Sequence, residues 1–194
     1  MCGRFLIHED SFFQAASIAQ IPAWIQGELH FGDVYPSMPA LVLVQKPGTM
    51  DLEGEIRTFG YSYERNGKKQ QVINARSETA AEKWMFKKAF KQNRAVVVCS
   101  RFYEWDPEKQ KVSFFEPGQT LYLGALILDD GFVILTKEAN PSVSPWHHRM
   151  PVIFDAVQAK TWILEPQLSQ VLIEQASPAL DHHLFSRQEK LFPA

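Results

Sequence analysis

The chain has 194 residues, of which 45% are hydrophobic and 22% are charged, and this composition indicates one folded domain over residues 1–194 with a sizeable core. The longest apolar stretch, around Leu121–Leu128, is far too short to span a bilayer, and the N-terminal Met-Cys-Gly-Arg-Phe lacks the pattern of a secretory signal, so we expect a cytoplasmic monomer that binds no membrane. The net charge of -2 argues mildly against a nucleic-acid binder, and DNA binding would therefore need a local cluster of Arg and Lys.

Short elements separated by loops are predicted in the first part of the chain. Ser11 is placed to cap a helix that runs through Gln20, with Phe12, Phe13 and Ala16 on its buried side. The strands predicted next are the buried run Ala40–Val44 and the alternating run Arg57–Tyr63, and Pro-Gly and Asn-Gly turn signals predict loops at Lys46–Gly54 and Glu64–Lys69.

The clearest helix is predicted over Thr79–Gln92. Thr79 and Glu82 have the spacing of a capping box. Phe86, Ala89 and Phe90 then recur at helical spacing, with lysines on the other face, which is typical of an amphipathic helix.

The second half of the chain is predicted to be mostly strands. Short connections favour antiparallel pairing among the apolar runs Arg94–Cys99, Val112–Phe115, Thr120–Leu128 and Phe132–Thr136, and Pro151–Phe154 is the last strand expected. Short helices are predicted at Asp155–Leu164 and Gln167–Gln175. The sum is an α+β fold: a single domain with a curved, mainly antiparallel, barrel-like β-sheet core flanked by short helices.

Metal and disulfide sites are not predicted. The two cysteines, Cys2 and Cys99, form no CxxC motif, and a structural disulfide is not expected in a cytosolic chain. The pairs His147-His148 and His182-His183 are neighbours in sequence, and neighbouring side chains rarely point at one metal ion. We therefore expect no metal and no cofactor.

Cys2 has unusual chemistry if Met1 is removed, as is normal when the second residue is small. The chain then begins with a cysteine that carries both a free α-amine, with a pKa of about 7.7–8.0, and a thiol with a pKa near 8.5. The amine attacks an aldehyde to give an imine, and the thiol closes a five-membered thiazolidine ring. The alternative is that Cys2 is an ordinary second residue.

Three further segments carry candidate functional groups, each with a plain structural alternative. Asn74 and Arg76 lie on a predicted strand-to-helix turn, where they could orient a small group and hold an anion, or simply form a capped turn. Glu104 lies in a strand between aromatic neighbours, so it points either inward, where burial would raise its pKa and suit acid–base chemistry, or to solvent. His147 beside Arg149 could carry protons next to a bound phosphate, or belong to a polar loop.

Four motifs occur in a diagnostic order: Met-Cys-Gly-Arg-Phe at the start, then Asn-Ala-Arg-x-Glu-Thr, Phe-Tyr-Glu-Trp and His-x-Arg-Met-Pro. Together they resemble the SOS response-associated peptidase (SRAP) family, whose members shield abasic sites in single-stranded DNA by cross-linking to them. The resemblance runs from Cys2 to about Phe154, and the remaining residues are not diagnostic.

The resemblance implies roles for seven residues. It places the nucleophile at Cys2, the asparagine that orients the reacting N-terminus at Asn74, the acid–base glutamate at Glu104 and the active-site histidine at His147. His148 falls at the variable position of its motif, and in an extended segment the two histidine side chains are expected to diverge. The arginines that hold DNA phosphates fall on Arg4, Arg76 and Arg149.

The sequence departs from the family pattern in three places. Many members carry Trp-Gly, a proline and a further tryptophan before Asn-Ala-Arg, whereas this chain reads Phe59-Gly60-Tyr61-Ser62-Tyr63, so the aromatic wedge that separates bases is either built from tyrosine or missing. Asp33 stands at a family asparagine, and Arg101 stands where the family has glycine. These changes concern the grip on DNA and leave the reacting centre intact.

The implied activity is a covalent cross-link in the DNA damage response. The Cys2 amine attacks the aldehyde of the abasic site with proton transfers through Glu104, and the thiol then closes the thiazolidine. The imine also permits loss of the 3′ phosphate, which implies some lyase activity. Two alternatives remain open, a cysteine peptidase that uses Cys2, Glu104 and His147, including on its own N-terminus, and a non-catalytic binder of single-stranded DNA.

Overall fold

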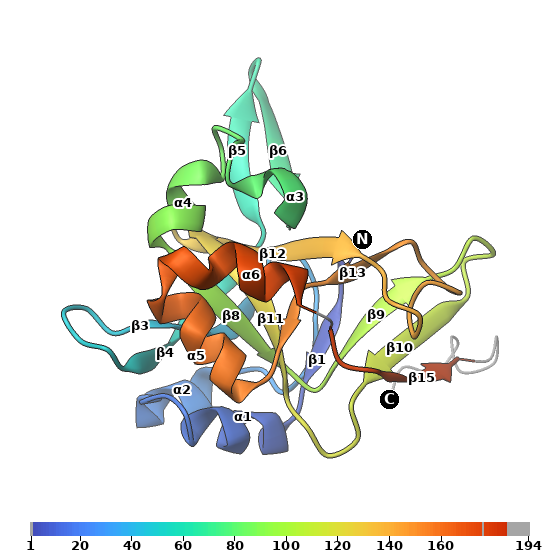
Figure 1. Ribbon diagram of the computed structural model, residues 1–194, viewed down its shortest axis with the longest axis horizontal. Coiled ribbons are helices and arrows are strands. Elements are labelled where there is room, and N and C mark those ends of the chain that lie inside the picture. The colour runs from blue at the N-terminus through green and yellow to red at the C-terminus, as the bar shows by residue number, and fades with distance from the viewer. Residues whose placement is uncertain (1, 176, 186–194) are drawn as a thin grey trace.

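A computed structural model of the chain describes residues 2–175 and 177–185 (Figure 1). Most strands belong to an eight-stranded sheet with the order β13-β12-β4-β3-β8-β11-β14, to which β7 adds on β12. These strands are β3 (Pro39–Gln45), β4 (Leu52–Phe59), β7 (Asn74–Arg76), β8 (Arg94–Cys99), β11 (Leu121–Leu128), β12 (Gly131–Glu138), β13 (Arg149–Pro151) and β14 (Ile153–Phe154).

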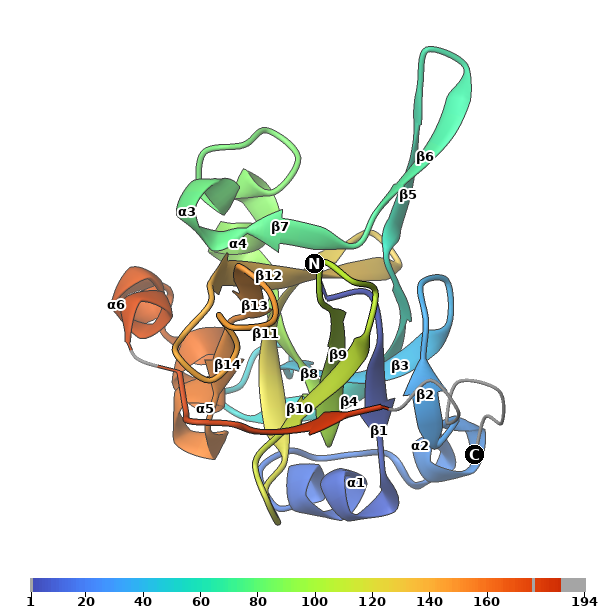
Figure 2. The same ribbon diagram turned by 90° about the vertical axis from the view of Figure 1, so that its right-hand side faces the viewer.

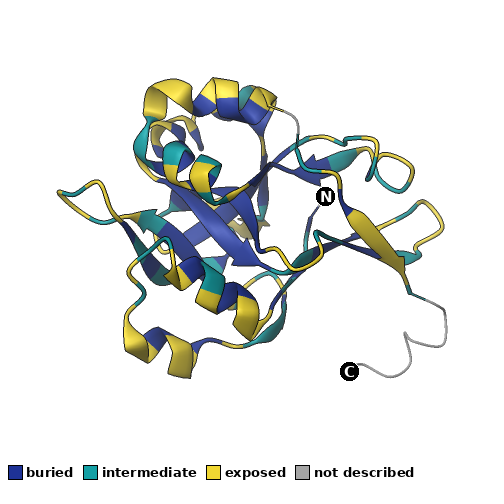
Figure 3. Ribbon diagram, turned by 60° about the horizontal axis from the view of Figure 1, so that its bottom comes forward, coloured by how far each residue is buried: buried dark blue, intermediate teal, exposed yellow. Residues whose placement is uncertain are grey.

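The eight-stranded sheet curls into a barrel, because β12 pairs with β4 on one side and with β11 on the other. Most of its pairings are antiparallel, while β12 runs parallel to β4 and β7. The apolar runs of β3, β8, β11 and β12 are buried on both faces, and Figure 3 shows this region in dark blue. The predicted α+β fold with a curved, mainly antiparallel sheet is therefore confirmed.

A second sheet and a hairpin complete the β structure. The five-stranded sheet has the order β15-β10-β9-β1-β2, and its strands lie together on the side that faces the viewer in Figure 2. They are β1 (Phe5–Ile7), β2 (Gly32–Val34), β9 (Arg101–Trp105), β10 (Lys111–Phe115) and β15 (Asp181–Leu184). The hairpin of β5 (Tyr61–Arg65) and β6 (Lys68–Val72) projects away from the rest of the molecule in both ribbon views.

Short helices cover the sheets. They are α1 (Glu9–Ala16), α2 (Ala23–Glu28), α3 (Ser77–Ala80), α4 (Lys87–Gln92), α5 (Ala156–Leu164), α6 (Ser169–Glu174) and the 3-10 turn η1 (Pro166–Leu168). Helix α5 begins with a capping box, in which Asp155 accepts from the backbone of Gln158 and the Gln158 side chain accepts from the backbone of Asp155. Trp162 on α5 is fully buried and donates to the Ala95 carbonyl of β8.

The predicted helix over Thr79–Gln92 is wrong as a single element. The chain forms α3 directly after β7, passes through turns, and resumes as α4 at Lys87. The intervening residues Trp84, Met85 and Phe86 are three successive large hydrophobic side chains, which cannot share one face of a helix. Phe86 is buried and Trp84 is 77% exposed, so the turns separate residues with different environments.

The first predicted helix is displaced. Helix α1 starts at Glu9 with His8 as its N-cap and ends at Ala16, while Ser11 lies inside it, buried and hydrogen-bonded to the Ser100 hydroxyl. Phe12 is buried as expected, but Phe13 is 55% exposed and Ala16 is also exposed, because the helix turns the Ser11, Phe12 and Ala15 positions toward the core.

Three predicted strand boundaries also change. Gly60, with φ of +99°, divides the predicted strand Arg57–Tyr63 into the end of β4 and the start of β5, and sends the chain into the hairpin. Strand β4 already begins at Leu52 inside the predicted loop Lys46–Gly54. Pro151–Phe154 is split between β13 and β14, and it is not the last strand, because β15 pairs with β10 further along the chain.

Candidate active site

The Cys2 thiol lies fully buried just before β1. Its Sγ is 3.8 Å from the carbonyl oxygen of Arg4, and both Cys2 and Cys99 are free thiols. Burial raises the pKa of the Cys2 thiol well above its ordinary value, and the nearby Glu104 and Cys99 raise it further. At neutral pH the site therefore holds a protonated thiol rather than a preformed thiolate.

Asn74 fixes the backbone of Cys2. It begins β7, which lies parallel to β12 with Asn74 opposite Ile134. Its side chain is buried, and Nδ2 donates to the Cys2 carbonyl oxygen at 3.0 Å. Among the residues that the structure describes, the buried Asn74 Oδ1 accepts no hydrogen bond. The amide thus holds Cys2 on one side and presents an acceptor inside the site on the other.

Glu104 lies on the inner face of β9 and is only 2% exposed. Burial raises its pKa to about 7, so the carboxyl group changes protonation near neutral pH. Oε1 lies 3.9 Å from Nδ1 of His147, too long for a hydrogen bond but close enough for an electrostatic interaction. A buried carboxyl group with this pKa can both give and take a proton.

His147, rather than His148, is directed toward Glu104. Its side chain is 15% exposed, and Nδ1 is 2.8 Å from the Arg149 carbonyl oxygen and 3.1 Å from the Arg149 amide nitrogen. Burial lowers the pKa of His147, so the neutral imidazole is favoured at neutral pH. The expectation that the two histidine rings diverge is wrong, because their centroids are 4.6 Å apart; strand β13 begins only at Arg149, so the alternation of a strand does not apply to them.

The three arginines assigned to phosphate binding have different surroundings. Arg149 donates two hydrogen bonds to the Glu78 carboxylate, at 2.6 and 2.9 Å, and one to the Thr136 carbonyl. Arg4 forms an ion pair with Asp33. Arg76 is exposed and, within residues 2–175 and 177–185, forms no ion pair. Arg76 is thus the arginine that can meet a phosphate without first leaving a carboxylate.

The structure therefore brings Cys2, Asn74, Glu104 and His147 together from four segments of the chain. Arg76 and Arg149 lie nearby, since Arg76 is opposite Thr136 in the β7–β12 pairing and Arg149 reaches the Thr136 carbonyl. Sequence reasoning did not identify Glu78 and Thr136 as partners of Arg149. No spacing rule could find them, because Glu78 is 71 positions away and the pairing depends on the sheet register.

The Tyr61 and Tyr63 side chains lie on the projecting hairpin, whose second strand leads through Ile73 to Asn74. Their rings stack with centroids 6.1 Å apart and an interplanar angle of 11°. Two aromatic rings thus lie on a segment that leads directly into the site. The sequence allowed either a base-separating wedge built from tyrosine in this segment or no wedge. The wedge itself stays a prediction.

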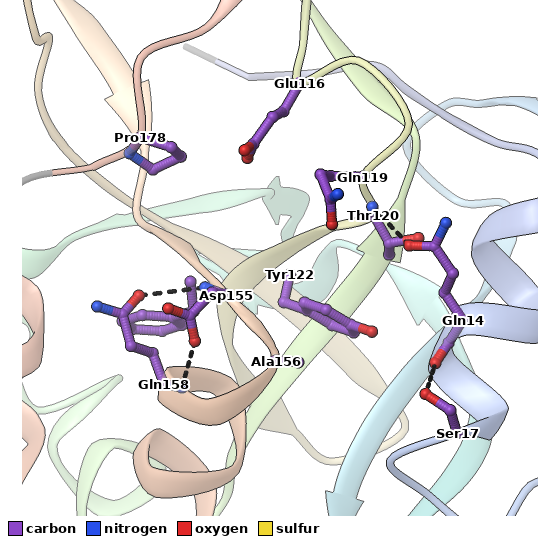
Figure 4. Close-up of a pocket in the computed structure, with 11 residues that line it drawn as sticks. Gln14, Ser17, Glu116, Gln119, Thr120, Tyr122, Asp155, Ala156, Gln158 and Pro178 are labelled. Carbon is purple, nitrogen blue, oxygen red and sulfur yellow. Dashed lines mark hydrogen bonds between the residues drawn. The ribbon is translucent and has the colours of Figure 1, made fainter.

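A pocket of about 420 Å³ lies elsewhere, between α1, the β10–β11 turn and the start of α5 (Figure 4). Its lining includes Gln14, Gln119, Tyr122 and the carboxylates Glu116 and Asp155. None of the side chains that line it is Lys, Arg or His, so it offers nothing to neutralise a phosphate. This pocket has no part in the chemistry described above.

The described residues contain neither a cluster suited to a metal ion nor a helix suited to a membrane span. No group of three or more His, Cys, Asp or Glu side chains among them is arranged to hold a metal ion. Within the same residues, no helix has the length and apolar character that a membrane crossing requires.

Comparison with known proteins gives a consistent result. A family model described as SOS response associated peptidase (SRAP) matches residues 1–188. Abasic site processing protein YoqW of Bacillus subtilis is 28% identical over 200 aligned positions, covering 90% of this chain and 87% of YoqW. Abasic site processing protein YobE of the same organism is 30% identical and covers 84% of this chain and 82% of YobE.

Three further comparisons are more limited, one in the length that it covers and two in sequence identity. Abasic site processing protein YedK of Escherichia coli is 31% identical over 107 residues, and the match spans 49% of this chain and 48% of YedK. A crystal structure of a protein from Bordetella bronchiseptica has a TM-score of 0.77 at 19% identity, covering 95% of this chain and 100% of that chain. A crystal structure of a protein from Bacteroides thetaiotaomicron has a TM-score of 0.73 at 16% identity, covering 99% of this chain and 95% of that chain. At these identities the structural likeness concerns the fold alone.

Proposed function

Because this chain belongs to the SOS response associated peptidase (SRAP) family, we propose that it processes abasic sites by cross-linking Cys2 to their aldehyde in single-stranded DNA. The observation that carries the proposal is the placement of Cys2. Its carbonyl is held by Asn74, and its thiol is buried near a carboxyl group that titrates at a pKa of about 7. The relatives named abasic site processing proteins support the choice of substrate.

The reaction begins at the amine rather than the thiol. Removal of Met1 leaves Cys2 with a free α-amine, whose pKa of about 7.7–8.0 makes part of it neutral at cellular pH. The neutral amine adds to the aldehyde carbon to give a carbinolamine. Protonated Glu104 gives its proton to the departing hydroxyl group, so that water leaves and a protonated imine forms.

Ring closure uses the buried thiol. The Cys2 sulfur adds to the carbon of the protonated imine, the thiol proton passes to the carboxylate that Glu104 has become, and the nitrogen keeps its proton as the ring amine. The net change is aldehyde plus aminothiol giving thiazolidine plus water. The raised pKa of the Cys2 thiol suits this order, since the thiol stays protonated until the imine has formed.

A cysteine peptidase is the second candidate, and the family description is the observation that favours it. Peptide hydrolysis needs a thiolate as the attacking group. The surroundings of Cys2 act against it, because burial and the neighbouring Glu104 both raise the pKa of the thiol. Any lyase activity belongs to the imine stage, where loss of the 3′ phosphate competes with attack by the sulfur.

A denaturing gel separates these functions. The purified protein is incubated with a single-stranded oligonucleotide that carries one abasic site, and with a matched oligonucleotide whose abasic analogue has no aldehyde. We expect a covalent band with the first and none with the second, at the mass of protein lacking Met1 plus DNA minus one water. A non-catalytic binder or a peptidase gives no such band with either oligonucleotide.

The Cys2→Ala variant tests the role of the sulfur. It retains the amine and loses the thiol, so it forms an imine that survives denaturation only after borohydride reduction. A fully stable adduct of Cys2→Ala without reduction would exclude the thiazolidine.

A further inference from the structure

The five-stranded sheet has a second face, on the side opposite Glu104. Leu6 of β1 lies opposite both Asp33 of β2 and Arg101 of β9, so these three side chains project to the same side. Along β9, Tyr103 follows Arg101 on that side, whereas Glu104 lies on the other. We call this side, with Arg4, Tyr35, Arg101, Tyr103, Lys111 and Phe115, the outer face.

Cations and aromatic rings alternate across the outer face. The Arg4 guanidinium carbon lies 4.6 Å from the ring centroid of Tyr35 and 5.0 Å from that of Tyr103. Lys111 Nζ lies between two rings, 4.1 Å from the Tyr103 centroid and 4.2 Å from the Phe185 centroid. The Arg101 guanidinium carbon lies 5.1 Å from the Phe115 centroid. These cation–π contacts hold the basic side chains in place without neutralising their charge.

Two of the three cations have no counter-ion within residues 2–175 and 177–185. Arg4 is paired with Asp33. Among the described residues, Arg101 and Lys111 form neither an ion pair nor a side-chain hydrogen bond, although both are partly buried. Burial and the nearby charges of Arg4 and Arg101 lower the pKa of Lys111, while the nearby Asp33 raises it, so that the pKa of Lys111 is lowered overall.

The acidic groups of this sheet compensate the two charges only in part, because Asp33 acts on Lys111 at a distance and is ion-paired with Arg4. Asp33 is already engaged by Arg4, and Asp181 lies opposite Phe115 on the edge strand β15. Asp181 forms no ion pair with a basic side chain in the part of the chain that the structure describes. An anionic ligand would neutralise the positive charges of Arg101 and Lys111.

We propose that the outer face binds nucleotides that flank the abasic site on the same DNA strand, with phosphates on Arg101 and Lys111 and a base stacked on Tyr35. The inference rests on the proposed function and names where the rest of its substrate lies. Arg4 is two residues from Cys2, a span of at most about 7 Å, so the face begins next to the reactive centre. Tyr35 is 43% exposed, which leaves ring surface for a base.

The chemistry of the face favours single-stranded DNA over an acidic peptide. Basic groups that track a backbone, interleaved with aromatic rings that accept bases of any sequence, are the features with which proteins bind single strands. An acidic peptide would use the cations and leave the aromatic rings without a partner. The face is also chain-specific, because Arg101 stands where the family resemblance places a glycine.

The test compares the double variant Arg101→Gln/Lys111→Gln with the matched control Lys88→Gln/Lys160→Gln, which removes the same charge from exposed positions on α4 and α5. Each protein is given an abasic trinucleotide and an abasic strand of about 15 nucleotides, a length within the site sizes of single-strand binders. The rate of adduct formation is measured with both. We expect the Arg101/Lys111 variant to lose the advantage of the longer strand while reacting normally with the trinucleotide. Equal slowing on both strands would overturn the proposal, because it would place the effect at the reactive centre.

Binding of an intact strand without an abasic site gives a readout independent of the cross-link. The log–log salt dependence should flatten by about 1.4 in the Arg101/Lys111 variant, since each of the two phosphates contributes about 0.7, and remain unchanged in the control. Tyr35→Ala should weaken this binding about fivefold with no change of slope. An unchanged slope in the Arg101/Lys111 variant, or equally effective competition by poly-glutamate, would overturn the proposal. If wild-type protein forms no adduct with any abasic strand, the proposed function fails, while these binding measurements still decide the outer face.

Discussion

Strand β9 separates two regions that handle charge in opposite ways. On the inner side of the strand, Glu104 is nearly inaccessible to solvent. Burial raises the pKa of Glu104 to about 7 and also raises the pKa of the Cys2 thiol. On its outer side Arg101 lies against an aromatic ring and, among the described residues, has no ion-pair partner. On the inner side, burial sets the protonation states of Glu104 and Cys2. On the outer side, the positive charge of Arg101 favours the binding of an anion. Reaction and binding can therefore be changed separately.

The largest expected effect comes from blocking the inner side at the amine. A peptide added before Cys2 that cannot be cleaved converts the amine to an amide, and an amide nitrogen does not attack an aldehyde. Adduct formation should stop although the thiol is intact, as judged on a denaturing gel. The same extension with a protease site just before Cys2 is the control, since cleavage should restore the reaction. A blocked protein that still cross-links would exclude the amine.

Glu104→Gln should have the next largest effect, slowing the reaction about 100-fold, the lower range for loss of an acid–base group. The wild-type rate should rise with pH as the amine becomes neutral near a pKa of about 7.7–8.0, and fall as Glu104 loses its proton above its pKa of about 7. The expected profile is a bell with its maximum between these values. The Gln variant should keep the rise and lose the fall. A bell that persists in Glu104→Gln would show that another group sets the high-pH limb.

The same substitution should stabilise the fold at alkaline pH. The pKa of Glu104 is higher in the folded protein than in the unfolded chain, so its contribution to stability is present below about pH 4.3 and is lost as the pH rises through about 7. Glutamine has nearly the same shape and no charge to bury. The Tm of Glu104→Gln should therefore exceed that of wild type by more at pH 8 than at pH 5, measured by differential scanning fluorimetry. An equal difference in Tm at pH 5 and pH 8 would mean that burial does not shift the pKa of Glu104.

The core strands and the residues of the inner side could be predicted from the sequence. The contacts that could not be predicted were missed for a physical reason. The apolar runs of β8, β11 and β12 were predicted because both faces of these strands are buried, and the four motifs marked Cys2, Asn74, Glu104 and His147. Their meeting in space depends on sheet register, which a single sequence does not specify. The ion-pair partners of the arginines were not predicted because they depend on this register. Asp33 pairs with Arg4 only because β1 and β2 lie side by side.

Arginine substitutions near the inner side should have smaller, unequal effects on DNA binding. Arg76 is exposed, and Arg76→Ala should flatten the log–log salt dependence by about 0.7, the contribution of one phosphate on a single strand. Arg149 is held by Glu78 and Thr136, so Arg149→Ala should change the slope less and reduce Tm more. Anisotropy titrations over a range of salt concentrations measure both slopes. A larger change in slope for Arg149→Ala would show that DNA displaces Glu78.

The smallest effects are expected from the two adjacent histidines, and they test whether the inner side extends beyond Glu104. His147 is 15% exposed and lies 3.9 Å from Glu104, whereas His148 is exposed and stacks on the ring of His147. Burial lowers the pKa of His147, so a neutral ring is ready to accept a proton from the sugar hydroxyl when the sugar opens to the aldehyde. The reverse path needs the same proton when the thiazolidine reopens and the sugar closes.

His147→Ala should therefore slow adduct formation a few-fold and slow adduct release by about tenfold, less than the loss of Glu104 because water can substitute for a partly exposed base. His148→Ala should change either rate by less than about twofold, because it removes a stacking neighbour and no proton carrier. The measurement is a time course of adduct formation followed by a chase with excess unlabelled abasic DNA. If His148→Ala carries the kinetic defect and His147→Ala does not, the proton passes through the exposed ring, and the inner side ends at Glu104.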